Sequence, residues 1–307
     1  MGRKLRYLPE GGALVEVTCR TLQGRLLLRP DPELNDIAAG ILGRSQRLYP
    51  VQIVGYVALS THYHLLVWAE DAQRLARFVG YFNANLAREI SRKTRWTGKI
   101  WDRRYQAIVV SNEEEAQVER LRYLLSHGVK EGLVEEVRDW PGLHCVRQIV
   151  DAEQLTGTWY DRTQEYAARH LRDENPDPLQ FTTRETVTLS PLPCWKHLSP
   201  EAYRQRVTNL AEEIDDEAAA TRKPTGAKPL GRATILAQDP VSRPKKLKKS
   251  PAPLFHAASK AMRHYLWEGF AWFVAAYRTA AEKLQRGDPD PRFPRGSFPP
   301  AMPFVSG

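Results

Sequence analysis

The chain has 307 residues, 42% of them hydrophobic, which is enough to bury the core of one large domain or two ordinary ones. No apolar run approaches the roughly 18 residues that a membrane span requires, and the first residues lack the apolar stretch of a secretory signal. We therefore expect a cytoplasmic protein with no membrane partner. The three cysteines form no CxxC pair, which argues against a disulfide framework or a structural zinc site.

The formal net charge of +9 favours a polyanionic partner, because neutralising phosphates releases their counterions. Charge alone does not separate nucleic acid from an acidic membrane, and a run of charges is commonly a solvated helix face. Between residues 72 and 110, however, nine basic residues stand against two acidic ones, and Trp96, Trp101 and Tyr105 lie among them. Cations interleaved with aromatic rings are what phosphate contact and base stacking need, although these tryptophans are also typical core anchors.

Seven elements are expected in the first half of the chain, from alternating β-branched stretches and from helical periodicity with capping residues. In chain order they are a strand over 13–21, a helix over 32–49, strands over 51–60 and 62–70, a helix over 71–98, a strand over 105–111, and a helix that begins near 112. This order predicts an α+β, ferredoxin-like antiparallel sheet with an extra helix. Helices cover one face of such a sheet, and the other face is left for a site.

The second half has weaker periodicity and more proline. Residues 1–150 are expected to form one domain, residues 151–221 an accessory segment, and residues 222–253 a flexible linker. The linker expectation rests on nine basic residues between 222 and 249 with Asp239 as the one acid. Residues 254–285 have the pattern of a long helix, and the proline-rich residues 288–307 should be extended.

Two pairs of side chains can carry chemistry. His62 and His64 are separated by one residue on a strand, so they project from one face and can share a metal ion. In the helix after the last strand, Tyr123 and His127 are an i, i+4 pair, on the side opposite the apolar stripe. Packing histidines and ordinary surface residues are the alternative readings. If this helix covers the free face of the sheet, His127 becomes a third ligand beside the Tyr123 hydroxyl, a set of groups suited to phosphodiester cleavage.

These residues resemble the single-tyrosine HUH transposases, and more closely the REP-associated tyrosine transposases. The resemblance spans about residues 5–142 and rests on THYHLLVWAED, GKIWDRRYQAIVVS and RLRYLLSHGVKEGLVEEVRDWPG. It implies that Tyr123 is the nucleophile and that His62, His64 and His127 are the metal ligands. One departure is that the family commonly has asparagine and proline where this chain has His127 and Gly128; histidine is a competent ligand, but losing the proline should loosen the helix end.

The resemblance further implies Mg²⁺ or Mn²⁺, a covalent 5′-phosphotyrosine intermediate, and a single-stranded, hairpin-containing (REP-like) DNA partner in a bacterial nucleoid. The protein would act as a monomer or homodimer. From the basic stretches and the N-terminus we expect DNA contacts from ten residues. They are Arg3, Lys4, Arg6, Arg88, Arg92, Lys93, Arg95, Lys99, Arg103 and Arg104.

Two other functions remain open from the sequence. A domesticated, non-catalytic DNA-hairpin-binding protein would keep the basic surfaces without the cleavage chemistry. A metal-dependent hydrolase of small phosphorylated molecules would use the histidine pair but gives no role to Tyr123 or to the basic excess.

Overall fold

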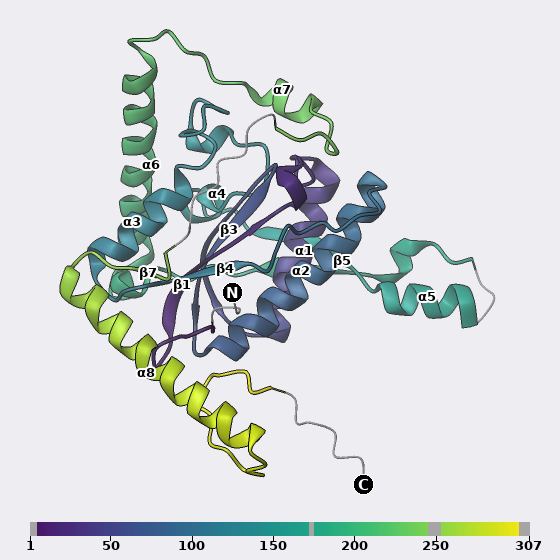
Figure 1. Ribbon diagram of the computed structural model, residues 1–307. Helices are drawn as coiled ribbons and strands as arrows, with labels where there is room; N and C mark the ends of the chain where they lie inside the picture. Colours follow the sequence, from purple (N-terminus) through teal and green to yellow (C-terminus); the bar gives the residue numbers. More distant parts are fainter. Residues whose placement is uncertain (1–4, 172–174, 245–252, 301–307) are drawn as a thin grey trace.

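The computed structural model describes residues 5–171, 175–244 and 253–300, and its centre is a five-stranded mixed sheet of order β2-β3-β1-β4-β7 (Figure 1). The strands are β1 (Ala13–Arg20), β2 (Gln52–Leu59), β3 (His62–Ala69), β4 (Gln106–Val110) and β7 (Phe255–His256). The first four strands pair antiparallel, in the order expected from the sequence. The fifth pairs parallel to β4, so the sheet is mixed and the wholly antiparallel prediction is wrong at this edge.

Two long helices cover one face of the sheet. They are α1 (Pro32–Leu48) and α2 (Ala72–Thr94), and their caps are the predicted ones: Asp31 accepts from the Leu34 amide and Asp71 from the Arg74 amide. Tyr63 of β3 points to this face and packs edge-on against Phe82 of α2. Because side chains alternate along a strand, His62 and His64 point to the opposite face.

That opposite face is covered by α3 (Glu114–Leu125), with α4 (Val146–Val150) beside it, and α6 (Pro200–Arg222) packs on both helices. Leu121 and Leu124 of α3 lie over Gly55 of β2, so the helix packs directly on this strand. Figure 1 shows α6 standing beside α3, and the two helices are in contact. The helix carrying Tyr123 therefore covers the free face, which is the placement that the sequence argument required.

A two-stranded sheet packs on α1, away from the central sheet. It consists of β5 (Leu155–Tyr160) and β6 (Thr182–Val187), with α5 (Arg162–Leu171) between them. The contact is backbone to backbone, because a Cβ at Gly40 would lie 2.3 Å from the Thr158 carbonyl oxygen. Glu185 of β6 is buried and pairs with Arg44 and Arg47 of α1.

The last part of the chain differs from its expected form. Residues 254–285 do not form one helix: Phe255–His256 is β7, and Ser259 caps α8 (Lys260–Gln285) by accepting from the Met262 amide. The reason lies at the free edge of β4, where the Val109 amide donates to Leu254 and the Ser111 amide to His256. Edge hydrogen bonds of this kind outweigh the helical pattern of a short segment.

The segment expected to be a flexible linker is attached to the core over its described part. The Leu230 and Gly231 amides donate to the Gly132 and Leu133 carbonyls, and α7 (Arg232–Ala237) buries Ile235. The remainder, 245–252, lies outside the described residues, as do the final residues 301–307 of the expected tail. Within the described chain, no helix is both long and apolar enough to cross a bilayer.

Candidate metal centre and nucleic-acid interface

Three histidines from two elements meet on the face of the sheet under α3. His62 and His64 come from β3, and His127 lies two residues beyond the last residue of α3. One ring nitrogen of each lies within 4.8 Å of the corresponding atoms of the other two, a spacing that a single metal ion can bridge. The His64 and His127 rings stack with centroids 4.3 Å apart. The structure thus brings together the three ligands that the sequence suggested.

The outer nitrogen of each ring is held by a neighbour. Nδ1 of His62 lies 2.8 Å from the Thr61 hydroxyl, Nδ1 of His64 lies 2.7 Å from Glu16, and Nδ1 of His127 lies 3.0 Å from Glu131. When Nδ1 carries the proton and donates it, Nε2 keeps its lone pair for a metal. The Nε2 of His127 is buried and has no hydrogen-bond partner among the described residues, as expected of a ligand atom.

Electrostatics favour the ligating form of two of these rings. Burial, followed by the neighbouring histidines, lowers the pKa of His62 well below its usual value. Burial also lowers the pKa of His127 to about 4, against the opposing effect of its hydrogen bond to Glu131. Neutral imidazole is the form that binds divalent metals, so both rings are ready to ligate at neutral pH. The chemistry of this donor set fits a divalent cation.

Tyr123 lies at the mouth of the same cluster and is 38% exposed. Its ring centroid is 4.9 Å from that of His127 and 5.7 Å from that of His64. Lys130 places its ammonium 3.4 Å from the centre of the Tyr123 ring. Burial, followed by the charge of Glu16, raises the pKa of the Tyr123 phenol, so it is protonated at neutral pH. An accessible phenol beside a metal-binding cluster can act as a nucleophile once it loses that proton.

Gly128 explains the departure from the asparagine–proline pattern. Its φ is +94°, a conformation closed to proline, and a Cβ there would lie 3.3 Å from both Val134 and Trp140. Its amide donates to the Glu131 carboxylate at 2.7 Å, and its carbonyl accepts from Leu133. The turn after α3 is therefore held by its own hydrogen bonds, in contrast to the looser helix end expected from the missing proline.

Glu16 was not singled out from the sequence, although it is central to the site. It is buried in β1 and joins His64 to Arg120 of α3, whose guanidinium lies 2.8 Å from the second carboxylate oxygen. Burial alone would raise the pKa of Glu16, but His64 and Arg120 lower it to about 2. The available signal was an acid within the apolar run ALVEVTCR. A buried charge is tolerated when it is paired in this way.

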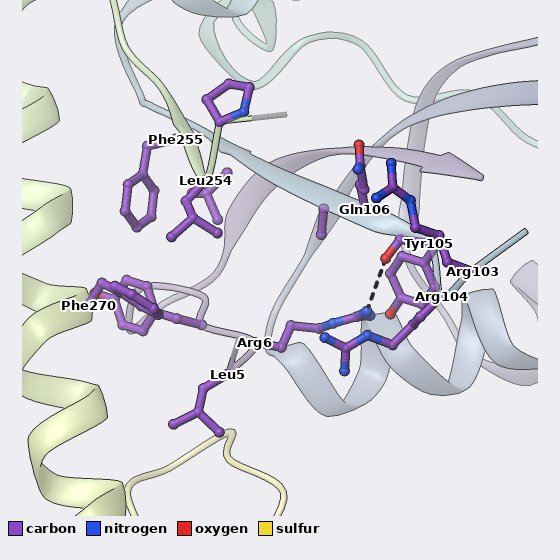
Figure 2. Close-up of a pocket in the computed structure, with 13 residues that line it drawn as sticks. Leu5, Arg6, Arg103, Arg104, Tyr105, Gln106, Leu254, Phe255 and Phe270 are labelled. Atoms are coloured by element: carbon purple, nitrogen blue, oxygen red, sulfur yellow. Dashed lines mark hydrogen bonds between the residues drawn. The ribbon is translucent and has the colours of Figure 1, made fainter. Parts of the chain in front are cut away.

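Three of the residues expected to bind DNA gather around a cavity of about 360 Å³ at the β4 edge. Figure 2 shows Arg6 beside Tyr105, with Arg103 and Arg104 close by. The Arg6 guanidinium lies 3.6 Å from the centre of the Tyr105 ring, and burial, followed by Arg104, lowers the pKa of Arg6 to about 9. Phe270 of α8 lines the same cavity. Clustered guanidinium groups and aromatic rings suit a nucleic-acid strand.

The other expected DNA contacts are dispersed. Arg88, Arg92 and Lys93 lie on α2, across the sheet from the histidines, and Lys93 is engaged by Asp31 at 2.9 Å. Arg95 and Lys99 are exposed in the loop that follows α2. Arg3 and Lys4 lie outside the described residues. The structure therefore does not unite the ten residues in one surface around Tyr123.

Comparisons with known proteins give one family match and one similar protein sequence. Residues 31–124 match the family described as IS200-like transposases. A Haemophilus influenzae protein classed as a REP-associated tyrosine transposase is 28% identical over 103 residues, covering 30% of this chain. The match covers 58% of that relative's length. His62, His64 and Tyr123 lie inside the family match, and His127 follows just beyond it.

Two solved structures are also similar to this chain. One is a REP-associated tyrosine transposase bound to a REP hairpin, with 20% identity and a TM-score of 0.39, covering 49% of this chain and 86% of the other. The second is a crystal structure from Deinococcus radiodurans described as a candidate transposase. It has 20% identity and a TM-score of 0.28, and covers 39% of this chain and 93% of the other.

Proposed function

The chain belongs to the IS200-like transposase family, and from this premise we propose that it is a metal-dependent single-stranded DNA endonuclease and strand transferase acting through Tyr123. The observation that carries the proposal is the meeting of Tyr123 with His62, His64 and His127, which come from a strand and a helix far apart in the sequence. Thr61, Glu16 and Glu131 each lie within hydrogen-bonding distance of Nδ1 of one ring, as the outer partners of metal-ligating histidines do.

In the proposed reaction, the phenolic oxygen of Tyr123 attacks a DNA phosphorus atom in line with the 3′ oxygen of the preceding nucleotide. The Tyr123 O–P bond forms, the P–O3′ bond breaks, and the 3′ oxygen leaves as a hydroxyl after taking up a proton. The phenol gives up its own proton before or during attack. Mg²⁺ or Mn²⁺, when bound, would polarise the phosphate and offset the charge of the transition state. Attack of a 3′-hydroxyl on the phosphotyrosine reverses these steps and rejoins DNA.

The substrate we propose is single-stranded DNA with a hairpin, of the REP-like kind that one structural relative holds. The basic excess of the chain supports a polyanionic ligand, and the arginine cavity at the β4 edge offers a second place for a strand besides the Tyr123 site. We propose a monomer or homodimer as the acting form.

The test is a search for a covalent protein–DNA adduct. The protein is incubated with 5′- and 3′-labelled oligonucleotides from the DNA that flanks its own gene, with Mg²⁺, Mn²⁺ or a chelator, and then denatured. We expect a metal-dependent adduct that carries the 3′ label, that Tyr123→Phe abolishes, and that Tyr166→Phe leaves intact, because Tyr166 is 61% exposed on α5. Tyr123→Phe should leave DNA affinity within about twofold, since one hydroxyl is a small part of the interface.

The alternative is a non-catalytic DNA-hairpin-binding protein derived from such an enzyme. It is favoured by one observation: His127 and Gly128 replace the residues that the resembling family commonly has at this point. Tight binding of hairpin oligonucleotides, with no adduct under any divalent metal, would establish this alternative and reject the nuclease.

A further inference from the structure

A cavity of about 480 Å³ opens directly beside Tyr123, and one of its walls comes from α6, far beyond the residues 31–124 that match the family. Tyr123, Val129 and Lys130 form one side, and Ile214, Ala218 and Arg222 of α6 form the other. Figure 1 shows why α6 can do this, since it stands along α3. The lining combines apolar side chains with three cations, Arg122, Lys130 and Arg222, and two carboxylates, Glu119 and Glu217.

Arg122, which lines this cavity, has one terminal nitrogen without a hydrogen-bond acceptor among the described residues. One of its terminal nitrogens pairs with Glu217 of α6 at 2.5 Å. The other, Nη1, is buried and has no hydrogen-bond partner among the described residues. A buried guanidinium N–H without an acceptor is costly, and an acceptor brought by a ligand would satisfy it. Lys130 and Arg222 also line the cavity, while its two carboxylates, Glu217 and Glu119, lie within ion-pair distance of Arg122 and His256. The acceptor is therefore expected to be anionic.

The chemistry of in-line attack decides which DNA segment fits. The leaving 3′ oxygen must lie opposite the Tyr123 oxygen across the phosphorus, so the released strand extends away from the tyrosine. The retained strand is bonded to the phosphorus through its 5′ oxygen, which lies in the equatorial plane, between the attacking and the leaving oxygens. A cavity that Tyr123 itself lines is therefore placed for the retained strand.

Resting on the function proposed above, we propose that this cavity holds the first nucleotide of the strand that stays attached to Tyr123. The base lies on the apolar floor of Val129, Ile214 and Ala218, and the next phosphate binds Arg122. A cavity of this size accommodates one nucleotide, which has the dimensions of a small ligand. In this arrangement α6 determines which nucleotide is accepted on the 3′ side of the cut.

The test combines two changes: a large side chain that fills the cavity, and an abasic residue in the DNA that removes the base proposed to occupy it. Ala218→Trp places a large side chain on the cavity wall, and Ala220→Trp places the same side chain on the exposed face of α6 as a matched control. Each protein is assayed for adduct formation on oligonucleotides that carry an abasic residue at successive positions around the mapped cut. With the unmodified protein, the abasic residue at the first retained position should lower the adduct rate about tenfold, equivalent to the loss of one well-placed contact.

Ala218→Trp should lower the rate about tenfold on intact DNA and lose its response to that abasic position, while Ala220→Trp behaves as wild type. Ala218→Leu, a milder filling, and thermal melting of each variant control for misfolding. Equal sensitivity to the abasic residue in wild type and in a folded Ala218→Trp protein would overturn the nucleotide proposal. The absence of any adduct with the wild-type protein would instead reject the proposed nuclease itself, so the two failures are distinguishable.

A second measurement does not require the tested protein to cleave DNA. In the Tyr123→Phe background, a 5′-phosphorylated oligonucleotide that begins at the mapped cut carries 2-aminopurine as its first base. Its fluorescence should change on binding, and Ala218→Trp should abolish the change while Ala220→Trp preserves it. An unchanged signal in the folded Ala218→Trp protein would contradict the proposal.

Discussion

Each of the three histidines offers the same ring nitrogen to the centre because a hydrogen bond holds the other one. Of these bonds, the one that His64 donates to Glu16 is the most buried, and Glu16 also connects the ring to Arg120. An outer partner of this kind fixes the tautomer and raises the basicity of the ligand. The strength of metal binding therefore depends on residues that never touch the ion.

Glu16→Gln tests this dependence. Glutamine keeps the shape and one acceptor but removes the charge, so Mn²⁺ affinity should fall about 10- to 100-fold. Mn²⁺ titration followed by electron paramagnetic resonance measures it, with exposed Glu10→Gln as the control. Unchanged affinity in a folded Glu16→Gln protein would mean that Glu16 serves only the ion pair with Arg120.

Gly128 adopts a backbone conformation that favours glycine, directly after the candidate ligand His127. Gly128→Ala should lower the free energy of unfolding by about 1–3 kcal/mol, because a side chain is strained at φ +94° and meets Val134 and Trp140. Gly80→Ala is the matched control, since a Cβ at this position of α2 meets nothing within 4 Å. It should be stabilising by about 0.5–1 kcal/mol. Chemical denaturation measures the free energy of unfolding of both variants. Equal changes would show that the turn at Gly128 accommodates a side chain without strain.

At the scale of elements, α6 is attached to the first half of the chain through Asp215, which accepts from the Val137 amide at 2.8 Å. Burial, followed by the charges of Glu136 and Asp139, raises the pKa of Asp215 to about 6, although the hydrogen bond opposes the shift. The folded protein therefore holds this proton more tightly than the unfolded chain does. Stability should fall as pH rises from about 4 to about 6, and the loss is complete above that range.

Asp215→Asn keeps the acceptor oxygen and removes the titration. The variant should be more stable than the wild type at pH 7.5 by on the order of 1 kcal/mol, a figure reduced for solvent screening of a partly exposed group. The difference should vanish as pH falls toward 4. Thermal melting across this range measures it, and Asp216→Asn, exposed on the same helix, should show no such trend. A constant difference at all pH values would indicate a packing effect.

The sequence predicted most elements of the first half because their signals are local. Asp31 and Asp71 cap the expected helices, and period-two alternation places His62 and His64 on one face. The two-residue strand β7 has no local pattern, and it forms only because β4 presents a free edge. Helical periodicity likewise does not say which face of the sheet α2 covers, so the sequence did not reveal that the α2 cations lie across the sheet from Tyr123.

Local sequence patterns also could not predict which side chains pair with the site residues, because the partners are distant in the sequence. Glu16 and His64 are 48 residues apart, and Arg122 meets Glu217 across 95 positions in the chain. Such pairs follow from the packing of elements and not from spacing along one of them. His127 was identified through its spacing from Tyr123, yet it lies past the end of α3, where the turn at Gly128 directs it inward.

At the scale of the whole molecule, the two halves share one hydrophobic core. Buried side chains from beyond residue 150 belong to the same cluster as the central sheet; they include Trp159, Leu192, Trp195, Val207, Ile214, Ile235 and Phe255. Glu113, which precedes α3, accepts from the Ala258 and Ser259 amides. The helix that carries Tyr123 is therefore held on one side by α6 and at its start by the segment that leads into α8.

Truncation after residue 150 tests how far the first half is a domain of its own. The shortened chain would expose the apolar surface of α3 and α4 that α6 now covers, and it would leave the edge of β4 unpaired. Because burial contributes about 25 cal/mol per Å² of apolar surface, the loss of several buried side chains is comparable in size to the 5–15 kcal/mol that usually stabilises a domain. Residues 1–150 should therefore show rapid amide hydrogen exchange in β4 and α3, and should aggregate on purification. A cooperative thermal transition in residues 1–150, with protected amides in both elements, would show that the first half folds alone and that the second half was added to a complete domain.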